Sequence, residues 1–278
     1  MNVLPANLKM GAVSLRVADL DLMLGFYTKG VGLEVLAANP GSYILGSGEE
    51  MVLVLEHAPE LKHASPSDAG LFHTAILFEQ RSSLATAVMS VAQKYPGRFT
   101  GSADHLVSEA FYFDDPEGNG VELYFDRPRD LWKKNGSEIE MATLPLDPNA
   151  YLQEHFNSEQ PGACAIGHVH LSVGSLDQAR DFYLKVIGFD LTNDYGNSAL
   201  FVSAGGYHHH MAMNIWRSRG AGRRQQTLGL GDLALELGTQ DALAALEDRA
   251  IFHGLQVQND GISLRLDDPW GNQVTIRA

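Results

Sequence analysis

The chain contains an internal repeat, and this repeat restricts its fold more than any other feature of the sequence. Residues 11–33 align with residues 167–189 without a gap, at an offset of 156 residues from position 11 to position 167. Each copy begins with alternating apolar residues, which is typical of a β-strand. A helix-like stretch follows and ends at Gly32 or Gly188, which suits a helix C-cap. The chain is therefore built from duplicated units that begin with a strand and a helix.

A second, weaker repeat lies nearer the end of each half. Residues 115–124 and 268–277 both begin with Asp-Pro-x-Gly-Asn between apolar runs, which indicates a hairpin turn. Upstream of each turn lies a further strand pattern followed by a helical pattern, with the helices expected at 81–95 and 239–253. The sequence thus predicts four units, which span residues 8–57, 70–126, 165–216 and 228–278.

These units predict an α+β fold of four βαβββ modules, whose curved sheets pair into two half-barrels around a cleft. We expect an N-terminal pair of modules over residues 1–126, a linker over 127–164 and a C-terminal pair over 165–278. The linker is rich in polar residues and carries the prolines Pro128, Pro145, Pro148 and Pro161.

Composition restricts the compartment and the partners. The formal net charge of −14 and the lack of a basic run argue against a nucleic-acid partner. We expect no membrane association, since no apolar run approaches the roughly 18–20 residues that a membrane span needs. The N-terminus lacks a signal-peptide pattern and Cys164 is the only cysteine, so a cytoplasmic location is expected. These features leave the oligomeric state open, a homo-oligomer included.

Several longer motifs carry a family resemblance that covers nearly the whole chain. They are GHVHLSV, FYLKVIGF, GGYHHHMAMNIW, DHLVSEAFYF, DPEGNGVELY and DRPRDLW. Together they resemble the vicinal oxygen chelate superfamily, and within it the ring-cleaving (extradiol) dioxygenases of the catechol 2,3-dioxygenase type. The resemblance implies that modules pair, that a metal lies inside a half-barrel, and that its ligands come from the first and last strands of modules.

Transferred position by position, the resemblance selects three ligands. The first-strand positions hold Ala12, His73, His168 and Asp232, and the last-strand positions hold Glu122 and Thr275. His73, His168 and Glu122 therefore form the expected metal set, and the resemblance implies that the metal is Fe(II). Two histidines and one carboxylate form the facial triad of non-haem iron oxygenases, and three positions stay open for a catecholate and O2.

This ligand set has a consequence for the fold. Many two-domain extradiol enzymes pair their third and fourth modules and bind iron there, which in this chain would offer only His168, Asp232 and Thr275. The complete set requires the second and third modules to pair across the linker. The first and fourth modules are then expected to pair separately and without metal.

The resemblance also suggests residues that contact the substrate. An acid/base histidine is expected in the run 207–211, where strand alternation puts His208 and His210 on one face, and similarity to the family favours His210. Tyr112 and His105 lie before the turn that leads to Glu122, and in similar enzymes a tyrosine and a histidine here hydrogen-bond the substrate oxygens.

The expected function is thus a non-haem Fe(II) extradiol dioxygenase that inserts both atoms of O2 into a catechol-type ring by meta cleavage. One alternative is a glyoxalase-like isomerase or transferase that uses Zn, Ni or Mn, with His210 as a fourth ligand. Another is a non-catalytic resistance protein that binds small molecules, although such proteins typically lack the ligand set.

Overall fold

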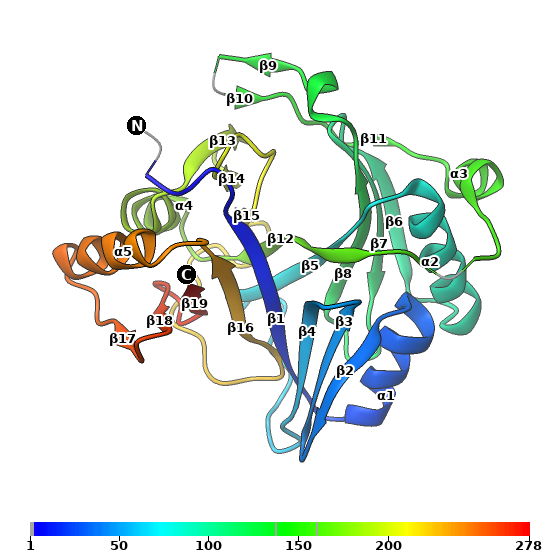
Figure 1. Ribbon diagram of the computed structural model, residues 1–278, viewed down its shortest axis with the longest axis horizontal. Coiled ribbons are helices and arrows are strands. Elements are labelled where there is room, and N and C mark those ends of the chain that lie inside the picture. Colours follow the sequence, from blue (N-terminus) through cyan, green and yellow to red (C-terminus); the bar gives the residue numbers. More distant parts are fainter. Residues whose placement is uncertain (1–2, 137, 160) are drawn as a thin grey trace.

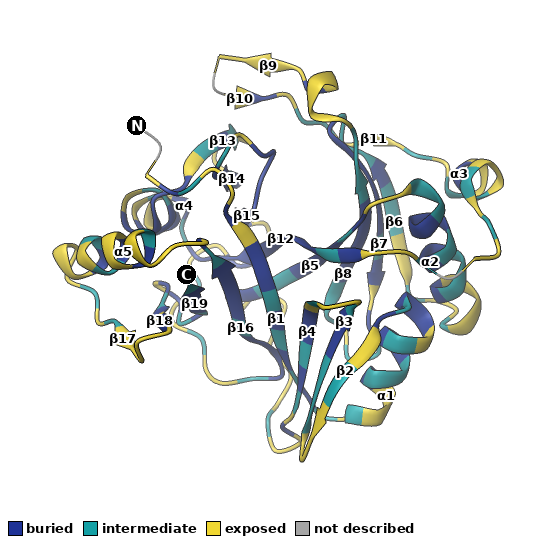
Figure 2. Ribbon diagram, in the orientation of Figure 1, coloured by how far each residue is buried: buried dark blue, intermediate teal, exposed yellow. Residues whose placement is uncertain are grey.

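The computed structural model describes residues 3–136, 138–159 and 161–278. Residues 1–2, 137 and 160 fall within the predicted N-terminal pair and linker, and they lie outside the described residues. Two large curved sheets dominate the molecule, and helices cover their outer faces (Figure 1). The central strands are buried, whereas the outward faces of the helices are exposed (Figure 2). The α+β class expected from the repeat is confirmed.

In the described part of the chain, the first sheet has eight strands in the order β17-β18-β19-β16-β1-β4-β3-β2. It joins the first module to the fourth through an antiparallel pair between β1 and β16. The strands are β1 (Lys9–Val17), β2 (Glu34–Asn39), β3 (Ser42–Ser47), β4 (Glu50–His57), β16 (Gly229–Glu236), β17 (Gln258–Asn259), β18 (Ser263–Asp267) and β19 (Gln273–Arg277).

The second sheet has nine strands among the described residues, in the order β11-β6-β7-β8-β5-β12-β15-β14-β13. Its centre is the antiparallel pair of β5 with β12, which joins the second module to the third. The strands are β5 (Gly70–Phe78), β6 (Phe99–Asp104), β7 (Ser108–Asp114), β8 (Gly120–Asp126), β11 (Leu144–Pro145), β12 (Cys164–Ser172), β13 (Asp190–Asp194), β14 (Ala199–Ser203) and β15 (Met211–Asn214).

The strand order confirms the module pairing that the ligand set required, because the second and third modules share one sheet and the first and fourth share the other. Each sheet therefore contains one module from either half of the chain. The division into separate units at 1–126 and 165–278 stays a prediction.

The helices follow the repeat. In the first and third modules, α1 (Leu20–Gly25) continues into the π-helical η1 (Phe26–Val31), and α4 (Leu176–Ala179) continues into η3 (Arg180–Ile187). Both end at the predicted glycines, which adopt left-handed φ values of 99° and 97° that other residues rarely adopt. The second and fourth modules carry α2 (Arg81–Lys94) and α5 (Gln240–Phe252).

The linker has more structure than its prolines suggest. It contains η2 (Arg129–Leu131), the short hairpin of β9 (Lys134–Asn135) with β10 (Glu138–Ile139), strand β11, and α3 (Pro148–His155). Strand β11 adds to the edge of the second sheet through β6. Trp132 packs with Val107, Ile139 and Tyr207 in a small separate hydrophobic cluster. This packing fixes the linker over one end of the second sheet.

The repeated tyrosines and aspartates connect neighbouring modules. The Tyr27 hydroxyl donates to Asp115 Oδ2 at 3.0 Å, and the equivalent Tyr183 hydroxyl donates to Asp268 Oδ2 at 3.1 Å. All four side chains are buried. Each aspartate also accepts backbone N–H groups of its own Asp-Pro-x-Gly-Asn turn. Both repeated motifs thus have a structural role, in which a helix is held against the turn of the next module.

We expect Tyr27→Phe to lower the free energy of unfolding by about 1–2 kcal/mol, because a buried hydrogen bond to a carboxyl group is lost while the ring packing is kept. Tyr183→Phe should cost a similar amount, and the double variant should lose about the sum, since one contact joins the first module to the second and the other joins the third to the fourth. Urea unfolding of the four proteins measures this. Single variants that are as stable as the parent would show that these hydrogen bonds contribute little.

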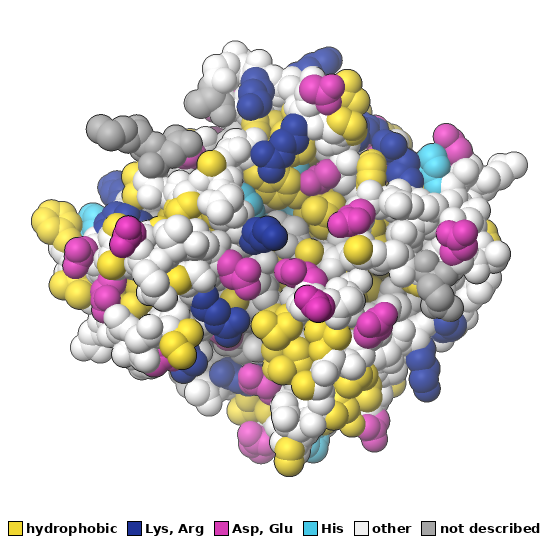
Figure 3. All heavy atoms as spheres, viewed as in Figure 1, with side chains coloured by type: hydrophobic (Ala, Val, Ile, Leu, Met, Phe, Trp, Pro, Cys, Tyr) yellow, Lys and Arg dark blue, Asp and Glu magenta, His cyan; other side chains and the backbone are white. Residues whose placement is uncertain are grey.

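The surface offers few further signals. Acidic, basic and hydrophobic side chains are interspersed on the face shown in Figure 3, with hydrophobic ones gathered over β2–β4. Among the described residues, no helix is both long enough and apolar enough to cross a membrane.

Candidate metal centre and its cavity

One row of residues crosses the second sheet from β7 to β12. Tyr112 on β7 lies opposite Glu122 on β8, Glu122 lies beside Ala75 on β5, and Ala75 lies beside His168 on β12. Residues in one row of a sheet point to the same face. Because Ala75 has a small side chain, the long side chains of Glu122 and His168 can lean over it from both sides and meet.

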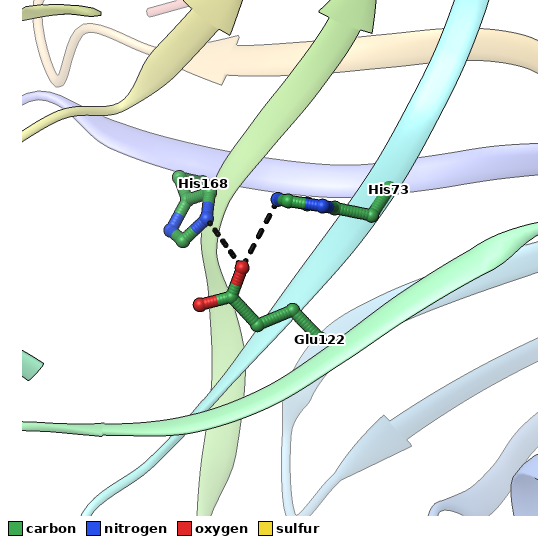
Figure 4. Close-up of side chains that lie close together, drawn as sticks. All are labelled: His73, Glu122 and His168. Atoms are coloured by element: carbon green, nitrogen blue, oxygen red, sulfur yellow. Dashed lines mark ion pairs between the residues drawn. The ribbon is translucent and has the colours of Figure 1, made fainter. Parts of the chain in front are cut away.

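The third candidate ligand joins them from the same strand as Ala75. His73 lies two residues earlier on β5 and so shares its face. His73 Nε2 lies 3.0 Å from Glu122 Oε2, and His168 Nε2 lies 3.3 Å from the same oxygen (Figure 4). All three side chains are almost fully buried. Among the described residues, no other group of three His, Cys, Asp or Glu side chains converges so closely.

These three residues fit a divalent cation. His73 Nε2 is buried and, although it contacts Glu122, it makes no hydrogen bond with any described residue, so its lone pair is available. Burial lowers the pKa of His168 to about 4, although the negative charge of Glu122 acts to raise it. Burial alone would raise the pKa of Glu122, but the adjacent imidazoles hold it well below its usual value. A neutral imidazole beside an ionised carboxylate is the protonation state that metal ligands need.

The small residue at the centre of the row allows a test that leaves every candidate ligand in place. We expect Ala75→Leu to push Glu122 and His168 apart, and so to lower metal content strongly at a folding cost of about 1–3 kcal/mol. Thr74→Val is the matched control, because it lies on the opposite face of the same strand and keeps its volume. Metal analysis of both variants decides the point. Equal metal content would mean that the spacing over Ala75 is not needed.

The candidate ligands line a cavity of about 320 Å³ together with other residues of the second sheet. Most of the lining is apolar or aromatic, which is typical of sites for small organic molecules. The linker segment 141–143 and the third-module residues Tyr195 and Phe201 also line it. Trp216, with 54% of its surface exposed, lies at the mouth.

Tyr112 and His105 both line this cavity and contact each other. His105 Nδ1 lies 2.6 Å from the carbonyl of Ala142, which can only accept, so Nδ1 carries a proton. In neutral His105, Nε2 then accepts from the Tyr112 hydroxyl at 2.6 Å. Burial, followed by the charge of Glu122, raises the pKa of Tyr112 well above its usual value. Tyr112 is therefore a neutral phenol whose oxygen can still accept a hydrogen bond from a ligand.

The histidine run is placed differently from the strand pattern. Strand β15 begins at Met211, so His208–His210 precede it in irregular backbone, where strand alternation does not apply. His210 does not line the cavity. Its Nδ1 accepts from the backbone of Ala204, and its ring packs against Tyr207. His209 lines the cavity instead, with its ring centroid 4.1 Å from that of His168.

A chain of hydrogen bonds holds His209 in place. Asp126 Oδ1 accepts from His208 Nε2 at 2.8 Å, and His208 Nδ1 lies 2.7 Å from His209 Nδ1. With the His208 proton on Nε2, His208 Nδ1 accepts and His209 Nδ1 donates. The lone pair of His209 is then on Nε2. Burial lowers the pKa of His209 well below its usual value, so the ring is neutral.

Sequence reasoning missed several residues that form the cavity. His170 lies directly across from His73 in the pairing of β12 with β5, and Asn214 Nδ2 donates to its Nε2 at 3.0 Å. Its spacing of two from His168 is the sequence signal that could have placed it on the ligand face. The segment 141–143 carries no motif, and only the path of the linker brings it to the site.

Comparisons with known proteins agree with this arrangement. Residues 9–123 and 165–276 match the family model described as the glyoxalase/bleomycin resistance protein/dioxygenase superfamily. The chain is 36% identical over 269 residues to a catechol-2,3-dioxygenase of Bacillus subtilis (strain 168), with 94% of this chain and 93% of that protein covered. It is 30% identical over 116 residues to biphenyl-2,3-diol 1,2-dioxygenase 3 of Rhodococcus globerulus, with 40% and 60% covered.

Solved structures show the same fold. A putative dioxygenase from Bacillus subtilis superposes with a TM-score of 0.66 at 13% identity, with 97% of this chain and 84% of that chain covered. Glyoxalase I from Zea mays superposes with a TM-score of 0.59 at 18% identity, with 98% and 92% covered.

Proposed function

The chain belongs to the glyoxalase/bleomycin resistance protein/dioxygenase superfamily and is an enzyme of the catechol 2,3-dioxygenase type, and we propose that it is an Fe(II)-dependent extradiol dioxygenase. Its substrates are a catechol-type aromatic diol and O2, and both oxygen atoms enter the ring by meta cleavage. The single observation that carries this proposal is the convergence of two buried histidines and one buried carboxylate in the lining of an aromatic-rich cavity.

His73, His168 and Glu122 would hold the metal. When bound there, Fe(II) would supply coordination positions for O2 and a catecholate, and a path for electrons from the diol to O2. The protein shields the metal position from water, since these three side chains are almost fully buried. Exclusion of water strengthens the polar contacts inside the pocket and protects the reaction from side reactions.

Other residues of the cavity orient the diol and move its protons. The Tyr112 hydroxyl donates a hydrogen bond to His105. Its oxygen can therefore accept a hydrogen bond from a substrate hydroxyl. His209 Nε2 can take a proton from a substrate oxygen and return it later as an acid. The family resemblance assigned the acid/base role to His210, and we propose His209 for it because His209 lines the cavity.

The arrangement supports the dioxygenase over the isomerase alternative. Enzymes of that alternative class often use a fourth protein ligand, for which the sequence offered His210. In the structure, His210 lies outside the cavity and its Nδ1 is bonded to Ala204. A three-ligand centre leaves room for both a diol and O2, and a fourth ligand would take one of those positions. The cytoplasmic location and a homo-oligomeric state stay predictions.

Oxygen-electrode measurements on Fe(II)-loaded protein test the proposal against a panel of catechols. We expect oxygen uptake only when both iron and a catechol are present, together with the yellow absorbance of a ring-cleaved product. Protein loaded with Zn instead should bind the diol without oxygen uptake, since Zn has no redox chemistry. Isomerase activity with the Zn form and no oxygen uptake with the iron form would favour the alternative.

A further inference from the structure

A second and larger cavity, of about 600 Å³, adjoins the candidate metal centre. Phe72, His73 and Tyr112 line both this cavity and the smaller one that the candidate ligands line. The connections between neighbouring modules, around residues 63–70 and 217–230, provide much of its remaining wall. The larger cavity is therefore closed by segments that the metal centre itself does not use.

A β-bulge directs Phe72 toward the boundary between the two cavities. His170 pairs with His73 and Leu171 pairs with Leu71, so Phe72 is the extra residue of β5. Its ring centroid lies 5.3 Å from that of His73 and 4.8 Å from that of His170. The two cavities thus meet beside a candidate ligand.

The larger cavity differs from the smaller one in charge. Among the described residues, no lysine or arginine lines the smaller cavity, whereas Arg217 and Arg224 line the larger one. Arg217 is exposed and Arg224 is half-buried. Other arginines, such as Arg127 and Arg180, pair with carboxylates, but neither of these two forms an ion pair with a described residue. Both charges are therefore available to an anion.

Uncharged acceptors hold Arg224 in place. Its Nη1 donates to Asn272 Oδ1 at 3.0 Å, and its Nη2 donates to Thr227 Oγ1 at 3.3 Å and to the carbonyl of Leu230 at 2.9 Å. Burial, followed by the charge of Arg16, lowers the pKa of Arg224 from its usual value. The guanidinium is thus fixed but not neutralised, and an anion bound beside it would stabilise its charge.

The acidic side chains of the larger cavity do not neutralise its arginines. Glu117 Oε1 accepts the backbone N–H of Ala18 at 2.8 Å, and Asp68 Oδ2 accepts the backbone N–H of Ser65 at 2.8 Å. Asp114 is exposed at the end of β7. Two of these carboxylates are therefore occupied by backbone donors, and the third is solvated.

Ring cleavage creates a carboxylate that the diol did not carry. When the carbon–carbon bond beside the diol breaks, one oxygen of O2 enters a carboxyl group and the other enters a carbonyl group. The carboxyl group loses its proton near neutral pH. We infer that the larger cavity binds the carboxylate of the ring-opened product as the product leaves the metal centre. This inference rests on the proposed function, because extradiol cleavage supplies that carboxylate.

Binding of cis,cis-muconate tests the inference, since this stable six-carbon dicarboxylate has the carbon skeleton of a ring-opened catechol. Isothermal titration calorimetry is performed without O2 on the Fe(II)-loaded full chain, with the dimethyl ester as the uncharged control. We expect muconate to bind and the ester not to bind. Catechol should bind equally well with and without muconate, because the two ligands occupy different cavities.

Arginine variants locate the bound carboxylate. Arg217→Gln removes the charge, and Arg219→Gln is the matched control, because Arg219 is an exposed arginine of the same loop that does not line the cavity. The dissociation constant of muconate should rise at least about tenfold in Arg217→Gln and stay unchanged in Arg219→Gln. Arg224→Gln should weaken binding as well, and circular dichroism checks that this variant stays folded.

The outcomes separate this inference from the proposed function. The inference is overturned, while the dioxygenase function stands, if muconate does not bind or if it displaces catechol. It is also overturned if Arg217→Gln and Arg224→Gln bind muconate as tightly as the parent. If muconate binds as expected but no catechol consumes oxygen, the proposed function fails and the cavity stands as a carboxylate site.

Discussion

Glu122→Ala should lose its metal and all ring cleavage while the protein stays folded, and the same is expected for His73→Ala and His168→Ala. Each change removes one of only three donors, and the two that remain hold a labile divalent ion poorly. We expect metal content to fall to near background and activity to fall by more than about 10³-fold, since the proposed reaction depends on the metal. The sheets should persist because they are held by their backbone pairing and core.

The matched control for these variants is His170→Ala. This histidine lies in the same cavity and directly across from His73, but Asn214 engages its Nε2 and it stands outside the converging group. Its variant should keep the metal. Iron analysis after reconstitution, together with circular dichroism, checks all four proteins. Near-stoichiometric iron in any one of the three ligand variants would exclude that residue as a ligand.

His209→Ala is expected to keep its iron and to bind a catechol, but to turn over about 10²–10⁴-fold more slowly. The reason is that His209 lines the cavity while Asp126 and His208 leave its Nε2 free to exchange a proton there. His210→Ala should have a much smaller effect on turnover. Its loss removes a contact with the backbone of Ala204, which lies outside the cavity.

Metal content, catechol affinity and kcat measured on the two histidine variants distinguish the possibilities. A slow His210→Ala enzyme beside a fully active His209→Ala enzyme would return the acid/base role to His210, as the family resemblance suggested. Loss of iron in His209→Ala would instead indicate that this residue binds the metal. A hydrogen-bonding role short of proton transfer would change KM more than kcat.

Much of the fold could be predicted because the chain repeats itself. Residues 11–33 and 167–189 show the same strand, helix and glycine end, and the structure follows both copies closely. The pairing of modules could be predicted from the sequence for a chemical reason. His73 and Glu122 lie in one module and His168 in another, so a single metal site required those two modules to share a sheet, as they do.

The details of the cavity depend on tertiary contacts that a local pattern does not contain. The run His208–His210 resembles a strand, but Gly205 and Gly206 adopt left-handed φ values just before it, and the strand begins only at Met211. Strand alternation therefore does not apply to the run, and His209 rather than His210 lines the cavity. The segment 141–143 reaches the site only because β11 adds to β6 and returns the linker across the sheet.

The central claim is that the chain uses a metal held by two histidines and a carboxylate to place both atoms of O2 in a catechol ring. Mass spectrometry of the product formed under isotopically labelled O2 tests it most directly, with Fe(II)-loaded protein and 3-methylcatechol. We predict that both labelled atoms appear in a ring-opened product, and that no such product forms with His168→Ala. A fully iron-loaded protein that leaves the ring intact, or a product with oxygen derived only from water, would contradict the account.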